Sequence, residues 1–112
     1  MDEMLDRKFV ALADPTRRAI LARLALGEAT VSELQRPFGI SQPAISRHLK
    51  VLEAAGLVEG GRAAQARPRR LKPEGLDAAR AWLDGLRTLW SDSFEALDAF
   101  LANSRTEGAD TR

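Results

Sequence analysis

The feature that most constrains this chain is residues 41–56, SQPAISRHLKVLEAAG, which have the marks of one helix with two defined ends. Ser41 can cap the N-terminus, because its hydroxyl accepts from the free N–H groups of the first turn. Pro43 fits that turn, where a missing N–H costs little. Gly56 follows the last periodic residue and suits a left-handed C-cap. The stretch therefore predicts a helix that begins after Ser41 and ends before Gly56.

The two faces of this helix differ in chemistry. Ile45, Leu49 and Leu52 are spaced by four and three residues, so we expect them to form one buried stripe. The opposite face has amide, hydroxyl and cationic groups and almost no acid, and it carries Gln42, Ser46, Arg47 and Lys50. Such groups suit the base edges and phosphates of a DNA major groove. The alternative is an ordinary amphipathic helix with a solvated polar face.

The bulk composition fits one modest domain. The chain has 112 residues, of which 45% are hydrophobic and 29% charged, as is ordinary for a globular protein. No apolar run approaches the roughly 18 residues of a membrane span. The N-terminal MDEMLDRKF is mixed and charged, so we expect no secretory signal and a cytoplasmic location. The absence of cysteine excludes disulfides, thiolate metal sites and thiol switches.

Positive charge is concentrated in the middle of the chain. Residues 36–72 carry eight Lys or Arg against two Asp or Glu, a net +6. Residues 1–35 have a net charge of −1 and residues 73–112 a net charge of −4, so the whole chain is only +1. The high density of positive charge in and after the predicted helix of residues 41–56 favours a polyanionic partner.

Two helices are expected ahead of the basic region. Residues 2–13 have apolar side chains about one turn apart. Asp14 can cap a second helix with Pro15 at its first position, ending near Leu26. Arg17 and Arg18 lie in its first turn, where they could face a phosphate or water.

A third, short helix leads into residues 41–56. Thr30 and Glu33 have the spacing of a capping box, and residues 30–38 follow it as a helix. Gly39-Ile40 is then a tight link. Two short helices joined by such a link form a helix-turn-helix, with residues 41–56 in the recognition position.

A β-hairpin is expected directly after this pair. Leu57-Val58-Glu59 suits the start of a strand, Gly60 to Gln65 a turn, and residues 66–71 a return strand that Pro68 limits to an edge. Such a hairpin is a wing, and its cations are Arg62, Arg67, Arg69 and Arg70. Arginine suits both the DNA backbone and the minor groove. The alternative is a solubilising, arginine-rich edge strand.

Pro73 opens a long last helix that we expect to reach Asn103, a length of about 45 Å. Apolar residues recur along it every three or four positions, namely Leu76, Ala79, Trp82, Leu83, Leu86, Leu89, Trp90, Phe94, Leu97, Phe100 and Leu101. A domain of this size cannot cover that stripe, so we expect a two-fold dimer interface. The alternative, a helix folded back onto its own core, is expected for the first third. Residues 104–112 are polar and are expected to be a disordered tail.

The order of these elements resembles the ArsR/SmtB-type winged helix-turn-helix repressors. The segments that carry the resemblance are LADPTRRAILARL (12–24), SQPAISRHLKVLEAAGLV (41–58) and the GR…R.LKPEGL pattern (61–76). The resemblance implies a mainly α fold with a small β-hairpin, in the order α-α-α-α-β-β-α, and a single domain over residues 1–103. It also implies a homodimer through the first and last helices that binds operator DNA and is commonly released by an inducer.

The chain departs from the metal-sensing members of that family. Their ELCVCDL-like motif is matched by EATVSEL (28–34), which places Thr30 and Ser32 where the motif has thiolates. Neutral hydroxyls are poor ligands for soft or borderline metals. The zinc-type members use histidines on the last helix, whereas the only histidine here is His48, which we expect to pack and hydrogen-bond. We therefore expect no metal site and no cofactor, as in the metal-site-free members of the family.

These arguments predict a sequence-specific DNA-binding transcriptional regulator, a repressor on a palindromic operator, with no catalytic residues. The predicted DNA contacts are Ser41, Gln42, Pro43, Ser46, Arg47, His48, Lys50, Arg62, Arg67, Arg69 and Arg70. The predicted dimer contacts are Leu5, Phe9, Trp82, Leu86, Leu89, Trp90, Leu97 and Phe100.

Other function classes fit less well. A winged helix that contacts an acidic protein is the alternative, because the basic face suits both partners. An enzyme is disfavoured, since the chain has no Cys, no Tyr, one His and no glycine-rich phosphate loop. RNA binding is disfavoured because the aromatic residues lie on the dimer stripe. The sequence does not specify an operator or a small-molecule inducer.

Overall fold

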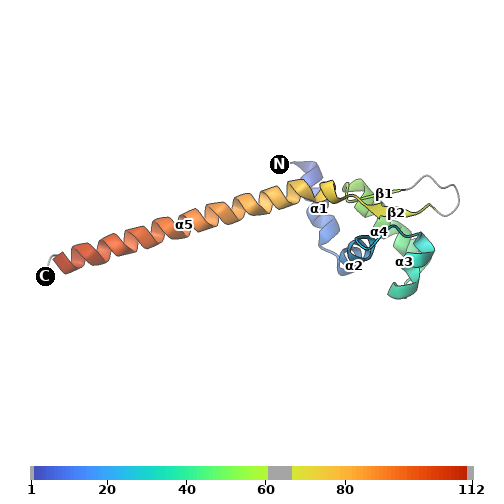
Figure 1. The fold of residues 1–112 in the computed structure, drawn as a ribbon, viewed down its shortest axis with the longest axis horizontal. Coiled ribbons are helices and arrows are strands. Elements are labelled where there is room, and N and C mark those ends of the chain that lie inside the picture. The colour runs from blue at the N-terminus through green and yellow to red at the C-terminus, as the bar shows by residue number, and fades with distance from the viewer. Residues whose placement is uncertain (1, 61–66, 111–112) are drawn as a thin grey trace. The chain divides into compact units, whose positions relative to one another are not determined.

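The computed structural model describes residues 2–60 and 67–110, with side chains described as far as Asn103. Its elements are α1 (Glu3–Leu12), α2 (Pro15–Leu24), α3 (Val31–Phe38), α4 (Gln42–Ala54), β1 (Val58–Gly60), β2 (Arg69–Leu71), a 3₁₀ turn η1 (Pro73–Leu76) and α5 (Asp77–Asp110) (Figure 1). The predicted fold class, mainly helical with one small hairpin, is confirmed. The chain divides into two compact units, Met1–Ala79 and Arg80–Arg112, which are described separately below. The single domain predicted for residues 1–103 stays a prediction.

The predicted helix starts in the first unit are confirmed. The Asp14 carboxylate accepts from the backbone N–H of Arg17 at 3.0 Å, and the Ser41 hydroxyl accepts from that of Ala44 at 3.2 Å. Thr30 and Glu33 form a complete capping box, in which each side chain accepts from the other residue's backbone N–H. Such caps satisfy donors that have no partner inside the helix, so short local motifs define where these helices begin.

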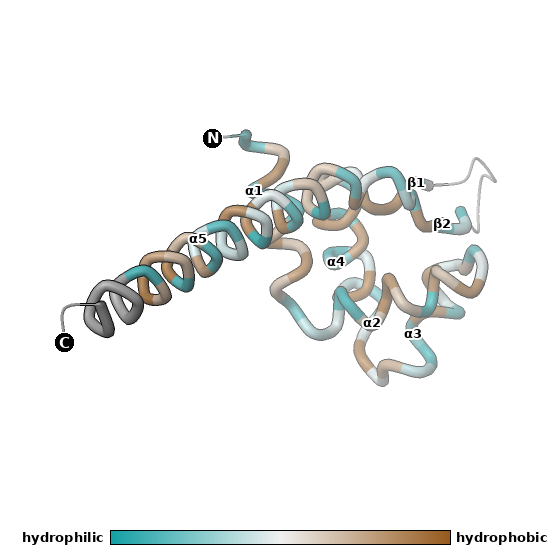
Figure 2. Tube along the Cα trace, turned by 60° about the vertical axis from the view of Figure 1, so that its left-hand side comes forward, coloured by the Kyte–Doolittle hydropathy of each residue, from teal (hydrophilic) through white to brown (hydrophobic). Residues whose placement is uncertain are grey.

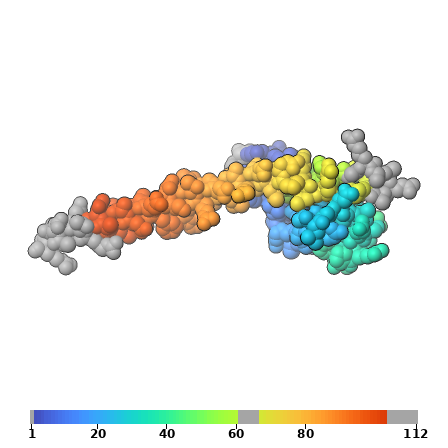
Figure 3. Space-filling view, in the orientation of Figure 1, coloured from blue at the N-terminus to red at the C-terminus, as the bar shows by residue number. Residues whose placement is uncertain are grey.

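The core of the first unit is built around α4. Ile45, Leu49 and Leu52 are almost completely buried, which confirms the predicted stripe. Helix α4 contacts α1, α2, α3 and β1, and Figure 3 shows α1 to α3, coloured from blue to teal, packed together. Burying each such side chain contributes roughly 1.5–3 kcal/mol. The apolar face of α4 is therefore the centre of the core.

The hairpin is antiparallel and pairs Val58 with Leu71 and Gly60 with Arg69. The return strand begins later than residue 66, and Pro68, which has no N–H to donate, directly precedes it. An unpredicted bridge adds a third chain segment to this small sheet. In it the Arg69 N–H donates to the Ala29 carbonyl at 2.7 Å and the Ala29 N–H donates to the Arg69 carbonyl at 3.0 Å.

Two glycines allow η1 to lie against the end of α4. Gly56 has φ +72°, as predicted for a left-handed C-cap. A Cβ on Gly75 would lie 1.9 Å from the Gly56 carbonyl oxygen, so only glycine fits at that approach. The need for glycine at position 75 comes from a tertiary contact that the sequence did not predict.

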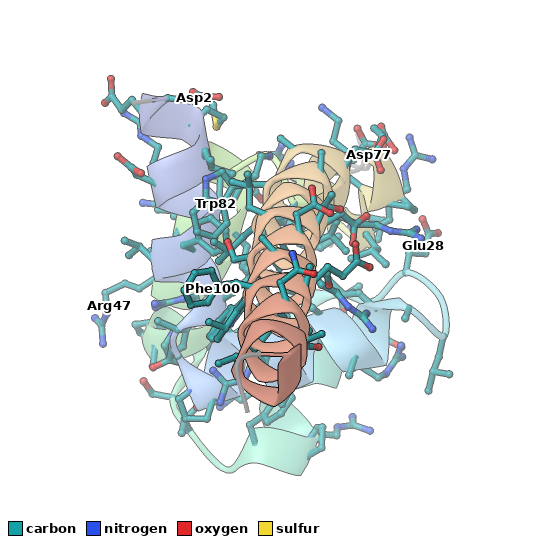
Figure 4. The ribbon with its side chains drawn as sticks, turned by 90° about the vertical axis from the view of Figure 1, so that its left-hand side faces the viewer. Asp2, Glu28, Arg47, Asp77, Trp82 and Phe100 are labelled. Atoms are coloured by element: carbon teal, nitrogen blue, oxygen red, sulfur yellow. The ribbon has the colours of Figure 1, made fainter. Side chains whose placement is uncertain are left out.

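In the second unit, α5 continues to Asp110, beyond the predicted end near Asn103. The disordered tail predicted for residues 104–112 stays a prediction. Apolar and polar segments alternate along α5 (Figure 2). Trp82 and Phe100 are separated by five full turns and lie on the same side of the helix (Figure 4). Ala79 is buried, whereas the stripe from Trp82 to Leu101 is 41–67% exposed.

In the described part of the chain, no helix combines the length and apolarity that crossing a membrane requires.

Candidate nucleic-acid interface

Helices α3 and α4 form the predicted helix-turn-helix. Gly39 ends α3 in the left-handed conformation, at φ +64°, and Ser41 caps α4 two residues later. On its polar face α4 exposes Gln42, Pro43, Arg47 and Lys50 beside its exposed N-cap Ser41, while Ser46 is half-buried; Val51 and Ala54 of α4 are also exposed. The Arg47 side chain projects away from the body of the first unit (Figure 4). A capped and buried helix therefore presents an amide, a hydroxyl and two cations to solvent.

His48 lies apart from this exposed face. Its Nδ1 is 3.3 Å from Arg17 Nη1 and 4.0 Å from Asp14 Oδ2, and its side chain is 22% exposed. The structure thus places the predicted DNA contact His48 among side chains of α2. The expectation that His48 packs and hydrogen-bonds fits this position.

Arg17 is half-buried and Arg18 is exposed, and the guanidinium groups of both donate to backbone carbonyls of α1. Arg17 Nε and Nη2 donate to the carbonyls of Ala11 and Val10, at 2.9 and 3.0 Å. Arg18 Nη1 donates to the Leu12 carbonyl at 2.7 Å. Cations are favourable beside the unpaired carbonyls at a helix C-terminus. The two arginines of α2 therefore cap α1, a role that sequence reasoning missed.

Lys8 is a second anchor that sequence reasoning missed. It is 6% exposed, and its Nζ donates to the Ala55 carbonyl at 2.7 Å. Ala55 is the C-cap of α4, so the ammonium group satisfies a carbonyl that has no partner within that helix. Lys8 connects α1 to the C-terminal end of α4.

The wing arginines occupy three different environments. Arg69 is largely buried, and its Nε donates to Glu53 Oε1 of α4 at 2.7 Å. Arg70 is exposed and pairs with Glu59 across the hairpin at 2.6 Å. Arg67 is exposed, and its guanidinium lies against Gly60, where an added Cβ would lie 2.9 Å from Nη2. Arg62 lies outside the described residues. Arg69 therefore also fixes the hairpin on α4.

Two carboxylates of the first unit have lowered pKa values. The pKa of Asp14 is lowered from 3.8, chiefly because its carboxylate accepts the Arg17 backbone N–H, with the Arg17 charge adding to the effect. The pKa of Glu33 is lowered from 4.5 by its hydrogen bonds with Thr30. Both shifts arise from helix caps, so they indicate structural roles for these groups.

The prediction that the chain has no metal site can be compared with the positions of the side chains at Thr30 and of the His, Asp and Glu residues. Thr30 Oγ1 accepts from the Glu33 N–H and donates to Glu33 Oε1, so its hydroxyl is committed to the capping box. Within residues 2–60 and 67–103, the structure shows no group of three or more His, Cys, Asp or Glu side chains that could hold a metal ion. The absence of metal sensing stays a prediction.

The apolar side chains of α1 differ in exposure, and the dimer contacts predicted at Leu5 and Phe9 stay a prediction. Leu5 is 8% exposed and Phe9 is half-buried, whereas Met4 and Val10 are 42% and 61% exposed. A groove of about 330 Å³ lies between α1 and α4, lined by Glu3, Asp6, Arg7, Val10, Val51 and Ala54. The exposed apolar surface of α1 is therefore centred on Met4 and Val10.

On α5, the exposed stripe contains a hollow of about 480 Å³. It is lined by Ala81, Trp82, Gly85, Leu86 and Leu89. A Cβ on Gly85 would meet nothing within 4 Å, so no contact within the described chain requires glycine there. Further along, the rings of Trp90 and Phe94 are stacked with centroids 6.3 Å apart. This face of α5 combines large aromatic side chains with a gap.

Comparison with known proteins places these features in a family. A family model described as a helix-turn-helix domain matches residues 12–61. The HTH-type transcriptional regulator Rv2034 of Mycobacterium tuberculosis is 45% identical over 106 residues, which cover 95% of this chain and 94% of that protein.

Solved structures agree with this match. A crystal structure of an ArsR family transcriptional regulator has a TM-score of 0.74 and 42% identity, covering 80% of this chain and 98% of that one. A homodimeric winged helix-turn-helix DNA-binding domain from Mycobacterium bovis, described as a possible ArsR-family regulator, has a TM-score of 0.62 and 28% identity. That alignment covers 77% of this chain and 80% of the other. The chain therefore belongs to the ArsR/SmtB-type family of winged helix-turn-helix transcriptional regulators.

Proposed function

We propose that this protein is a DNA-binding transcriptional repressor that binds an imperfect palindrome as a homodimer. The observation that carries the proposal is the exposed face of α4, where Gln42, Arg47 and Lys50 are open while the opposite face forms the core. A helix fixed in this way can enter a major groove without rearrangement of the domain. As a regulator of transcription, it would act in the cytoplasm and need no catalytic residue.

The first two turns of α4 are proposed to read bases. Gln42 and Ser46 offer donors and acceptors, and Arg47 offers the planar fork that matches the O6 and N7 acceptors of guanine. Arg47 is the strongest candidate for a base contact, because its exposed side chain projects away from the body of the first unit (Figure 4).

The remaining predicted contacts are proposed to meet the DNA backbone. Ser41 and Pro43 lie at the α4 N-terminus, where free N–H groups and the helix dipole favour a phosphate. Lys50, Arg67 and Arg70 supply exposed cations, and Arg62 belongs to the same proposed set. Arg69 and His48 are held by Glu53 and Arg17, so we propose that they act mainly by holding the wing and α4 in place.

The homodimer is proposed to form through α5 and the exposed part of α1. The stripe from Trp82 to Leu101 is too large an apolar surface to leave in water. Glycine in a helix interior costs about 1 kcal/mol relative to alanine, and nothing in the described chain requires it at Gly85. We propose that a second copy of the chain approaches the α5 backbone there. Predicted contacts Leu86, Leu89, Trp90, Leu97 and Phe100 lie on the same stripe. Leu5 and Phe9 of α1 stay in the proposed set, with Met4 and Val10 as the more exposed apolar side chains of that helix.

The alternative of a protein-interaction module is not favoured by the family to which the chain belongs. A nuclease footprint on duplex DNA distinguishes the two functions. The repressor should protect a site with half-sites about 10 bp apart, one on each side of a two-fold centre. The proposal would be contradicted if the protein protected none of the tested duplexes from the nuclease but still bound an acidic protein surface.

A further inference from the structure

We infer that Arg17 is a positioning residue for DNA binding, because it fixes the protonation pattern of His48 and thereby holds the recognition helix α4 on the end of α1. This inference rests on the function proposed above, since it assigns a residue outside the DNA-facing surface to the same activity.

The first step concerns how Arg17 is itself held. Its guanidinium donates to the carbonyls of Val10 and Ala11 at 3.0 and 2.9 Å, so two of its three nitrogens are fixed by the last turn of α1. Its backbone N–H donates to the Asp14 carboxylate at the start of α2. The planar fork therefore has a defined orientation before it reaches any other helix.

The second step concerns Nη1, the remaining guanidinium nitrogen of Arg17. Arg17 Nη1 lies 3.3 Å from His48 Nδ1, although the two residues are 31 positions apart in the sequence. A guanidinium group can only donate hydrogen bonds. A hydrogen bond across this contact therefore requires His48 Nδ1 to accept and to carry no proton, with the single proton of the neutral imidazole on Nε2, although the acceptor Asp14 Oδ2 lies 4.0 Å from the same nitrogen.

The third step connects this tautomer to α4. His48 follows directly after Arg47, the proposed base-reading residue. The contact from Arg17 to His48 thus joins the middle of the recognition helix to the C-terminal end of α1. Lys8 joins α1 to the C-cap of the same helix, through the Ala55 carbonyl. These two contacts fix α4 on α1 at separate points, and only the Arg17 contact lies beside the proposed DNA-reading side chains.

Arg18 is a matched control within the same turn. It also caps α1, through the Leu12 carbonyl, but it has no contact with His48 among those that the structure shows. Arg17→Gln and Arg18→Gln each remove one positive charge and one helix-capping guanidinium. Only Arg17→Gln removes the donor that faces the imidazole.

The first measurement is nitrogen NMR of the imidazole, which is simple because His48 is the only histidine in the chain. At a pH where the ring is neutral, we expect a protonated Nε2 and a bare Nδ1 in the wild type and in Arg18→Gln. Arg17→Gln should instead give a mixture of the two tautomers. An unchanged tautomer in Arg17→Gln, or a wild-type proton on Nδ1, would overturn the inference.

The second measurement is the affinity for the selected duplex at several salt concentrations. Arg17→Gln should raise the Kd about tenfold, the size of effect expected for one charge-assisted hydrogen bond. Arg18→Gln should change it much less, and the salt slope should be the same for both. A salt slope that falls by about one in Arg17→Gln would mean that Arg17 meets a phosphate directly, which contradicts the inference.

A pair of His48 variants keeps the test valid if Arg17→Gln does not fold. In His48→Asn, a carbonyl oxygen near the position of Nδ1 can still accept from Arg17, whereas His48→Leu removes the acceptor. We expect His48→Asn to bind DNA nearly as the wild type does and His48→Leu to bind about tenfold more weakly. Equal losses in both variants would refute the positioning role. A wild type that binds no duplex would instead refute the proposed function, while the NMR result would still stand by itself.

Discussion

At the scale of single residues, the chemistry of the α4 face separates side chains that read bases from those that hold phosphates. Replacing Arg47 with alanine should cost roughly 1–3 kcal/mol on the selected site and relax the preference at one base position. The reason is the loss of a bidentate contact that only guanine satisfies fully. Titration of the variant against the selected and a scrambled duplex measures this effect.

Lys50→Ala is the matched control on the same exposed face. It should lower the affinity for the selected and the scrambled duplex about equally, because a phosphate contact carries no sequence information. It should also reduce the slope of affinity against salt concentration by about one. If Arg47→Ala also weakened both duplexes equally, base reading would have to be assigned to Gln42 and Ser46.

The Asp14 cap predicts a pH dependence of folding. Its pKa is lowered in the folded chain, mainly by the Arg17 backbone N–H, so its contribution to stability is present above the ordinary value of 3.8. That contribution is lost as the pH falls below 3.8 through the lower folded pKa. Denaturant melts across this range should show a smaller acid-induced loss in Asp14→Asn, since asparagine caps without titrating. If the unfolding free energy of the two proteins had the same dependence on pH, the proposed contribution of the Asp14 carboxylate would be contradicted.

At the scale of elements, what the sequence predicts depends on how far apart the interacting residues lie. The caps at Asp14, Thr30 and Ser41 join residues three apart, and the stripe of Ile45, Leu49 and Leu52 follows the helical period, so both were predictable. Lys8 and Ala55 are 47 positions apart. No local pattern brings such a pair together, because it depends on how α1 crosses α4.

The same limit applies to the candidate site. The exposed polar face of α4 was predicted from its spacing. The Arg17–His48 contact and the Ala29–Arg69 bridge depend on tertiary packing and were missed. Arg69 was predicted as a phosphate contact from its charge alone, and sequence gave no sign that Glu53 would hold it.

The contact of η1 with the end of α4 makes Gly75 sensitive to substitution. Gly75→Ala should destabilise the first unit by roughly 1–3 kcal/mol, the usual cost of overpacking, because the new Cβ would overlap the Gly56 carbonyl oxygen. Thermal unfolding measures the effect. Ala78→Gly, a change of the same size at an exposed α5 position, should cost no more than about 1 kcal/mol, and a Gly75→Ala variant as stable as wild type would contradict the contact.

At the scale of the whole molecule, the exposed stripe of α5 predicts a dimer. Sedimentation should show a two-chain species at micromolar concentration, and glutamate at Leu86 and Trp90 should give monomer or aggregate, because burying unpaired charge is costly. Thr88→Glu is the control, since residue 88 lies on the opposite side of the helix at 100° per residue. A monomeric wild type, or equal dissociation by Thr88→Glu, would contradict the proposed interface.

The side-chain chemistry also predicts how the complex responds to metals. Stoichiometric Zn(II), Cd(II) or As(III) should leave the protein–DNA complex intact, because hydroxyls stand at Thr30 and Ser32 and make poor ligands for these ions. Gel shifts with and without each metal test this. Loss of the shifted band that a chelator restores would show that the chain holds a metal site after all.

The central claim, that two copies of α4 read DNA in a two-fold arrangement, is tested most directly by selecting bound sequences from a pool of random duplexes. The account predicts an imperfect palindrome whose half-sites lie about 10 bp apart and contain a guanine that Arg47→Ala no longer selects. A pool that stays random after repeated selection, or a single asymmetric site that Arg47→Ala still selects, would contradict it.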